Sequence, residues 1–247
     1  MADFYQNGIV TTLHNLTDRP VEDLERELMS FSRLRPMSLV LPSLFSELEG
    51  PALSNIIDEV AQVPYLNEIV IGLDRADQSQ YEFAQKFFSK LPQHHRILWN
   101  DGPRLRKLDE MLAEKGLSPT EMGKGRNVWY CYGYVLASGR AESVALHDCD
   151  IVTYDRSLLA RLIYPVAHPG FNYVFGKGYY TRIAEQKMNG RVSRLLVTPL
   201  LRALKKVYGS LDFLEYLDSF RYPLSGEFSM RADALNDIRI PSDWGLE

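Results

Sequence analysis

Ser143-Val144-Ala145-Leu146-His147-Asp148-Cys149-Asp150-Ile151-Val152 is an apolar run that ends in two carboxylates spaced by one residue. Side chains of a strand alternate between its two faces, so Asp148 and Asp150 are expected to point the same way where the strand leaves its sheet. Two such carboxylates suit Mg²⁺ or Mn²⁺, ions that keep positions open for water and substrate phosphates. The stretch therefore predicts a metal site for nucleotide chemistry, against the plainer interpretation that Asp favours turns and helix starts.

Two other residues of this stretch are predicted to be structural. His147 precedes the carboxylates and should face the other side of the strand, as a core or surface histidine with satisfied hydrogen bonds. Cys149 is expected to be a small buried side chain, with a soft ligand or nucleophile as the alternative. The only other cysteine is Cys131, and neither has metal-type spacing around it, so a disulfide framework is excluded.

Composition bounds the class of protein. The chain has 247 residues, of which 45% are hydrophobic and 24% charged, enough for one substantial core. A net charge of −4 gives no general attraction for nucleic acid, which is therefore not expected as a partner. The apolar runs are far shorter than the ~20 residues of a membrane span. Because the N-terminus also lacks a signal pattern, we predict a cytoplasmic protein with no membrane partner.

Strand and helix patterns alternate outward from the carboxylate stretch. Apolar runs predict strands at 37–41, stopped by Pro42, and at 67–73 and 95–99. Helical spacing predicts helices at 50–63, 80–91 and 127–138, together with an N-terminal arm that holds a helix near 21–31. This alternation predicts an α/β fold: a mostly parallel sheet with helices on both faces. Ligands of such sheets bind beyond the carboxyl ends of the strands, where Pro42-Ser43-Leu44, Asp74 and the two carboxylates should converge.

Three further motifs suggest contacts with anions or a sugar. Gly123-Lys124-Gly125-Arg126-Asn127 precedes a helix, so free backbone N–H groups and a lysine are expected to face a pyrophosphate, unless it is an ordinary loop. Asn189-Gly190-Arg191-Val192-Ser193-Arg194 offers guanidinium groups and a hydroxyl, or else a solvated helix start. Glu227, in Tyr222-Pro223-Leu224-Ser225-Gly226-Glu227-Phe228, suits sugar hydroxyls, although a capping or salt-bridged role competes.

Taken together and in order, these motifs resemble the retaining glucosyl-3-phosphoglycerate synthases and their mannosyl-3-phosphoglycerate relatives, which are GT-A (Rossmann-like) glycosyltransferases. The resemblance covers most of residues 37–247, and its specific pieces lie at 41–44, 123–125, 148–150, 190–193 and 223–227. It implies transfer of an α-hexosyl group, with glucose favoured, from UDP-glucose or GDP-mannose to 3-phosphoglycerate. The product would serve glucosylglycerate synthesis, and a homodimer is compatible with it. No residue suggests itself as a nucleophile, so attack on the same face is favoured.

The resemblance also implies roles for individual residues. The nucleotide sugar would be bound by Pro42, Ser43, Leu44, Glu47, Asp74, Lys124, Asp148 and Cys149. Asp148 and Asp150 would bind the Mg²⁺ or Mn²⁺, and with Glu227 on the transferred hexose they would be the catalytic residues. The acceptor's phosphate and carboxylate would be held by Gly190, Arg191 and Ser193.

Three parts of the chain follow from this resemblance. They are an N-terminal arm at 1–36, a nucleotide-sugar half at 37–155 and a C-terminal acceptor-binding half at 156–247. The family continues beyond the position of Glu247 and supplies a histidine metal ligand there, so we expect an incomplete chain.

Two other functions stay open. A haloacid-dehalogenase-like phosphatase also uses an Asp-x-Asp motif, but it would have Thr where Val152 stands. Its motif would also lie at the start of the fold, whereas here it follows several predicted strands. A nucleotide-sugar sensor without catalytic activity is the second alternative.

Overall fold

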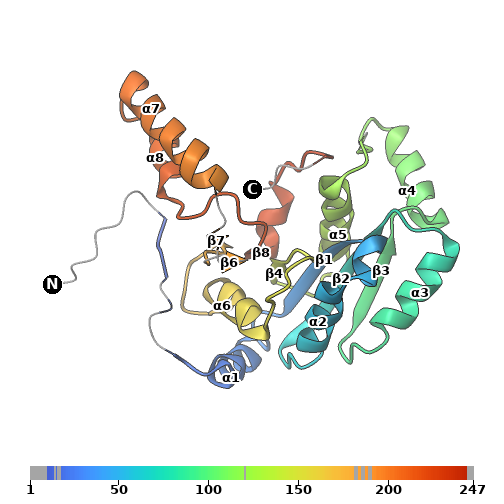
Figure 1. Cartoon of the computed structure of the whole chain (residues 1–247). Coiled ribbons are helices and arrows are strands. Elements are labelled where there is room, and N and C mark those ends of the chain that lie inside the picture. The colour runs from blue at the N-terminus through green and yellow to red at the C-terminus, as the bar shows by residue number, and fades with distance from the viewer. Residues whose placement is uncertain are drawn as a thin grey trace. The chain divides into compact units, whose positions relative to one another are not determined.

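The structure, a computed structural model, describes residues 10–13, 15, 18–119, 121–180, 183–184, 187–188 and 191–243 (Figure 1). Gly190 and residues 244–247, on which two of the expectations above fall, lie outside this set. The chain divides into two compact units. Of the described residues, those within 19–176 and 226–243 form one unit, and those within 10–18 and 177–225 form the other. The predicted split into donor and acceptor halves is a functional one and stays a prediction.

The first unit is built on a sheet that has six strands in the described part of the chain, in the order β3-β2-β1-β4-β8-β5. Strands β1, β2, β3 and β4 run parallel to one another, whereas β8 is antiparallel to β4. The mostly parallel sheet is therefore confirmed. The strands span Met37–Leu44 (β1), Leu66–Asp74 (β2), His95–Trp99 (β3), Ser143–Leu146 (β4), Phe175–Lys177 (β5) and Phe228–Arg231 (β8).

Strand β1 continues through Pro42, so the expectation that this proline stops the strand is wrong. Backbone groups of successive strand residues point to opposite neighbours, and Val40 faces β4, because its carbonyl accepts from the His147 N–H at 3.2 Å. Pro42 faces the same side, where β4 has already ended at Leu146. Its missing N–H therefore removes no ladder hydrogen bond, and β1 follows β2 as far as Leu44.

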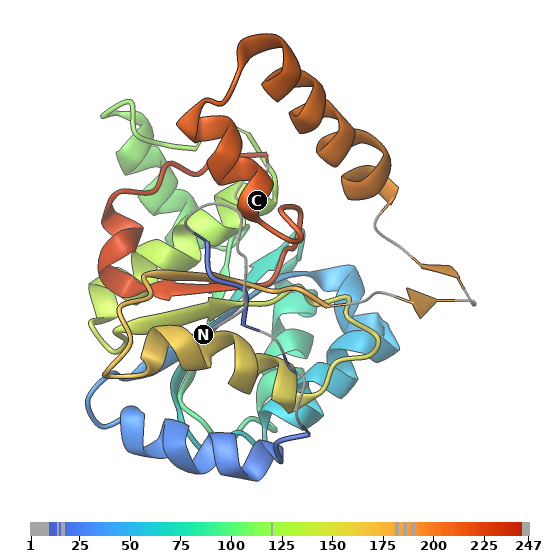
Figure 2. The same cartoon turned by 90° about the vertical axis from the view of Figure 1, so that its left-hand side faces the viewer.

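Helices cover both faces of the sheet, as predicted, and each face has its own core. Leu39 and Leu41 of β1 face one core, and Val40 faces the other, as strand alternation requires. Figures 1 and 2 show α1 and α6 side by side, and both pack on the first face with α2 and α3. The helices of this unit span Val21–Phe31 (α1), Pro51–Val60 (α2), Gln78–Phe88 (α3), Pro103–Ala113 (α4), Lys124–Ser138 (α5) and Arg156–Ala167 (α6).

Two short 3₁₀ turns complete the first unit. One spans Phe45–Glu49 (η1) directly after β1, and the other spans Ala232–Asn236 (η3) after β8. Helix α5 and η3 pack on the second face of the sheet. Among the described residues, no helix has both the length and the apolar character that crossing a bilayer would require.

The second unit contains a small hairpin and helices. Strands β6 (Ile183–Ala184) and β7 (Lys187–Met188) pair antiparallel, and a π-helical stretch at Ser193–Val197 (η2) leads into α7 (Thr198–Tyr208). Helix α8 (Asp212–Ser219) follows, and Lys205 of α7 pairs at 2.7 Å with Glu215 and with Asp218. Residues 193–208 are thus helical throughout, with the π-helical turns at the start.

Candidate active site

A cavity of about 180 Å³ lies among the residues at and beyond the carboxyl ends of β1, β2 and β4. Every residue that was predicted from the sequence to bind the nucleotide sugar lines this cavity, and so does Asp150. Three lining residues were not predicted as site residues. The lining consists of Pro42, Ser43, Leu44, Glu47, Asp74, Arg75, Gly123, Lys124, Asn127, Asp148, Cys149 and Asp150.

Asp148 and Asp150 both line the cavity, but strand alternation is not the reason. Strand β4 ends at Leu146, so both carboxylates lie in irregular chain beyond it. Asp148 forms an ion pair with Lys124, and these side chains are 23% and 32% exposed, respectively. Gly226 lies against the same carboxylate, because a Cβ there would collide with it. Asp148 is thus held between a lysine and a glycine turn, whereas Asp150 is exposed.

The two residues around Asp148 differ in how well they were predicted. Cys149 is buried, as expected, and burial raises the pKa of its thiol well above the usual value, which disfavours a nucleophilic thiolate. His147 is also fully buried, with its ring edge-to-face on Tyr154 at 5.4 Å between centroids. Neither of its ring nitrogens has a hydrogen-bond partner among the described residues, so the expectation of a satisfied histidine is wrong. Burial lowers the pKa of His147 to about 3.

The N-terminus of α5 is not the open anion cradle that the sequence suggested. The N–H of Gly125 donates to the carbonyl of Asp243 at 3.2 Å, and the N–H of Arg126 donates to that of Ser242 at 2.8 Å. These helix-start donors are therefore satisfied by backbone from the C-terminal side of the chain. The amides of Gly125 and Arg126 are thus not free to bind an anion, and of this motif's predicted donors the Lys124 side chain remains as the cation that lines the cavity.

Asp74 is neutralised by the residue that follows the Gly-Lys-Gly motif. Its carboxylate is 3% exposed and lies 3.3 Å from Nη2 of Arg126, while Nδ2 of Asn100 donates to it at 3.4 Å. Next to Arg126, Asn127 donates to the carbonyl of Gly72 at 2.9 Å, which fixes α5 against β2. The motif was recognised in the sequence, but the structural roles of Arg126 and Asn127 were not.

Glu47 shapes the turn that follows β1. Its Oε2 accepts from the N–H of Leu44 at 2.9 Å, which closes the start of η1. Burial raises the pKa of Glu47, and the hydrogen bond from Leu44 opposes that shift. This carboxylate therefore organises the cavity wall in addition to lining it.

The remaining predicted site residues are not among those that line this cavity. Glu227 is fully buried directly before β8, one residue after the Gly226 that touches Asp148, and its contact with a hexose stays a prediction. Arg191 is exposed and Ser193 is buried, and both belong to the second unit. Their role toward the acceptor also stays a prediction, and Gly190 lies outside the described residues.

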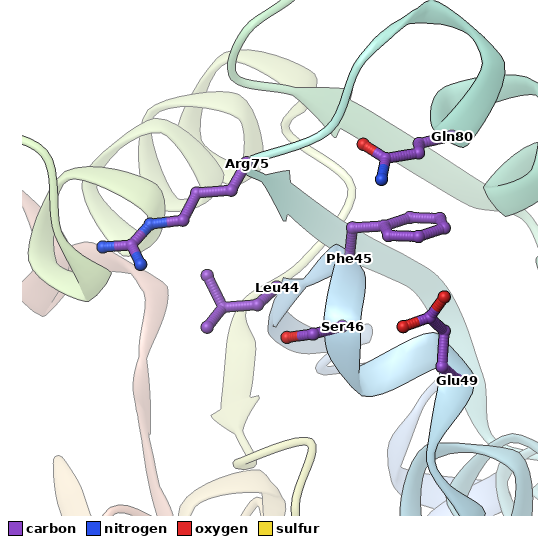
Figure 3. A pocket seen from close by; sticks show the side chains of 6 residues that line it. All are labelled: Leu44, Phe45, Ser46, Glu49, Arg75 and Gln80. Carbon is purple, nitrogen blue, oxygen red and sulfur yellow. The ribbon is translucent and has the colours of Figure 1, made fainter.

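A second cavity, of about 320 Å³, shares Leu44 and Arg75 with the first. It is lined by the side chains that Figure 3 labels: Leu44, Phe45, Ser46, Glu49, Arg75 and Gln80. In this view the Arg75 side chain extends past Leu44, on the side away from Phe45 and Gln80.

The carboxylate pair fits a divalent cation that a substrate helps to bind. Within the described ranges, no group of three or more His, Cys, Asp or Glu side chains is arranged to hold a metal ion. Mg²⁺, however, is usually held by one or two carboxylates, with water and substrate phosphates as its other ligands, and Mn²⁺ prefers the same donors. Asp148 and Asp150 supply two such groups on one cavity, and Lys124 already places positive charge at Asp148.

Two curated proteins match this chain over all or nearly all of its length. A glucosyl-3-phosphoglycerate synthase from Persephonella marina is 49% identical over 247 residues, which is 100% of this chain. The predicted resemblance is confirmed. A second glucosyl-3-phosphoglycerate synthase, from Methanococcoides burtonii, is 41% identical over 99% of this chain. The chain spans 61% and 60% of the lengths of these two synthases, and no family model matches it.

Solved structures show that the chain has the GT-A fold of such synthases. The Mycobacterium tuberculosis glucosyl-3-phosphoglycerate synthase in complex with Mn²⁺, UDP and glucosyl-3-phosphoglycerate superposes with a TM-score of 0.59 at 20% identity. That alignment covers 90% of this chain and 64% of the synthase. The mannosyl-3-phosphoglycerate synthase of Rubrobacter xylanophilus gives 0.58 at 22% identity, covering 87% of this chain and 58% of that one.

Proposed function

We propose that this protein is a metal-dependent, retaining glucosyl-3-phosphoglycerate synthase that transfers glucose from UDP-glucose to 3-phosphoglycerate. The observation that carries the proposal is the single cavity that collects Asp148, Asp150 and Lys124 beside the turn after β1. Carboxylates and a lysine at strand ends suit a nucleotide diphosphate with its cation. Glucose is favoured over mannose because both curated relatives are glucosyl synthases.

The charges of the cavity support this assignment. Arg126 neutralises Asp74, and Lys124 pairs with Asp148, which leaves Asp150 and Glu47 as the further lining carboxylates. Asp148 and Asp150 would hold the Mg²⁺ or Mn²⁺, which when bound stabilises the leaving diphosphate. Lys124 then becomes available to the diphosphate, and Glu47 keeps the wall of the donor pocket in place.

The acceptor contacts are proposed from the sequence. Arg191 and Ser193 would bind the phosphate and carboxylate of 3-phosphoglycerate, since a guanidinium group pairs well with such anions. Glu227 would accept hydrogen bonds from hydroxyl groups of the glucose. Burial raises the pKa of the Cys149 thiol and so disfavours a nucleophilic thiolate, in keeping with attack on the same face without a covalent intermediate.

Incubation of the purified chain with UDP-glucose, 3-phosphoglycerate and Mn²⁺ tests the proposal. We expect glucosyl-3-phosphoglycerate with an α-anomeric proton signal by NMR, and little product with GDP-mannose in place of UDP-glucose. Nucleotide binding without transfer would favour the sensor instead. Release of inorganic phosphate from 3-phosphoglycerate without a sugar donor would favour the phosphatase.

A further inference from the structure

Arg75 lines both cavities and has no role in the function proposed above. It follows Asp74 directly and has a backbone φ of 55°, the one positive φ of a non-glycine residue in the described part of the chain. A left-handed backbone costs such a residue roughly 1–2 kcal/mol. Strained residues of this kind cluster at ligand-binding sites.

The guanidinium group of Arg75 is not needed by its neighbours. Asp74 is already paired with Arg126 at 3.3 Å and with Asn100 at 3.4 Å. On the other side, the N–H of Ala76 donates to Asp101 at 3.2 Å. The Arg75 side chain is exposed, and it forms no hydrogen bond or ion pair with any residue that the structure describes. Its donors are therefore available to a ligand.

The lining residues indicate which part of a ligand Arg75 would meet. Lys124 and the two Asp residues line only the first cavity, and they suit the diphosphate and its cation. Leu44 lines both cavities together with Arg75, and Figure 3 shows the Arg75 side chain extending past Leu44, on the side away from Phe45. An apolar surface with a few well-placed donors suits a nucleobase better than a phosphate.

We propose that Arg75 recognises the base of the nucleotide-sugar donor, with its guanidinium group donating to a ring carbonyl oxygen of uracil beside Leu44. This inference rests on the proposed function and adds to it a residue that binds the base. Arginine is suited to this task because its planar N–H groups match the lone pairs of carbonyl acceptors.

Three variants separate the side chain from its backbone. Arg75→Gly removes the guanidinium group and accepts the left-handed φ without strain. Arg75→Lys keeps the charge but loses the planar fork. Arg33→Ala removes another exposed arginine, in the turn after α1, and serves as the control.

Calorimetry with Mn²⁺ present would measure the dissociation constants for UDP, UMP, ribose 5-phosphate and pyrophosphate. Arg75→Gly should weaken UDP and UMP by the same factor, about 10- to 100-fold. Ribose 5-phosphate and pyrophosphate should bind unchanged, Arg75→Lys should restore only part of the loss, and Arg33→Ala should match the wild type.

Unchanged UDP binding by Arg75→Gly would overturn the inference while the proposed function stands. A loss that includes pyrophosphate would show that Arg75 serves the diphosphate, and a loss that includes ribose 5-phosphate would show a contact to the ribose phosphate. Either result overturns the assignment to the base. Failure of the wild-type chain to bind any uridine nucleotide would overturn the donor site itself, and this inference with it.

Discussion

Asp150 provides the most direct test of the proposed metal site at the scale of single residues. It is exposed beyond the end of β4, so Asp150→Ala should leave the thermal unfolding midpoint nearly unchanged. Loss of an outer-shell contact costs a metal site about 10- to 100-fold, and loss of a carboxylate ligand should cost at least that much in Mn²⁺ affinity and in glucose transfer. Titration of Mn²⁺ in the presence of UDP would measure the metal affinity of the variant, and a transfer assay would measure its rate. Wild-type values for both would show that Asp150 is not a ligand.

Gly226 tests the position of Asp148 without changing any charge. A Cβ at residue 226 would meet the carboxylate atoms of Asp148, which lie at the end of a side chain that can rotate away. Gly226→Ala should therefore leave the protein folded but weaken Mn²⁺ binding, because Asp148 is displaced from the cavity. Chemical denaturation and metal titration on one sample would separate the two effects. If metal affinity is retained, Asp148 does not need its present position.

At the scale of elements, two glycines of the same helix provide a matched pair. A Cβ at Gly125 would collide with the backbone of Pro241, which cannot rotate away, whereas a Cβ at Gly133 would meet nothing within 4 Å. Gly125→Ala should destabilise the protein by about 1–3 kcal/mol through overpacking. Gly133→Ala should stabilise it by roughly 0.5–1 kcal/mol through helix propensity. Urea denaturation of both variants would test this, and a similar effect at both positions would contradict the packing of residues 241–243 on α5.

Local patterns predicted the parallel strands and several of their helices, and distant partners explain two features that they missed. The parallel strands and their helices follow from apolar periodicity, so their carboxyl ends, with Asp74 and Asp148, could be placed together in advance. Strand β8 has four residues and joins β4 from far along the sequence, and nothing local marks such a pairing. Helix α5 likewise begins earlier than predicted, at Lys124, where backbone near Asp243 supplies its first acceptors.

The candidate site shows the same division. Residues in motifs at strand ends were found from the sequence, because topology alone brings those ends together. Arg75 was missed although it follows Asp74 directly, since its positive φ is not visible in the sequence. His147 was expected to have hydrogen-bond partners. The alternation of side chains along a strand predicts which face a side chain occupies, but it does not predict whether a hydrogen-bond partner lies there.

At the scale of the whole molecule, His147 should make stability depend on pH. Its pKa is about 3 in the fold, because of burial, against about 6.5 in an unfolded chain. The unfolded state therefore binds the extra proton below pH 6.5, so this contribution to stability is present above pH 6.5 and is lost as the pH falls toward 3. Between pH 7.5 and 5.5 the loss from this one group should be about 1.4 kcal/mol.

The variant His147→Phe isolates that contribution. A phenyl ring of similar shape keeps the contact with Tyr154 but cannot be protonated. Urea denaturation at both pH values should show a weaker loss of stability for the variant, and other titrating groups cancel in the comparison. If both proteins lose the same free energy of unfolding between the two pH values, protonation of the His147 imidazole does not cause the loss of stability in acid.

Strand β8 and the backbone that caps α5 are synthesised late, and this affects how the protein folds on the ribosome. Strands β1 to β4 are complete once Leu146 has been synthesised, but the second neighbour of β4 and the acceptors for Gly125 and Arg126 come only with residues 228–243. At bacterial-to-eukaryotic rates of translation, the interval between Asp150 and Asp243 lasts roughly 5–20 s. During that time the nascent chain has an unpaired edge at β4 and an uncapped helix, which is when it would most need a chaperone.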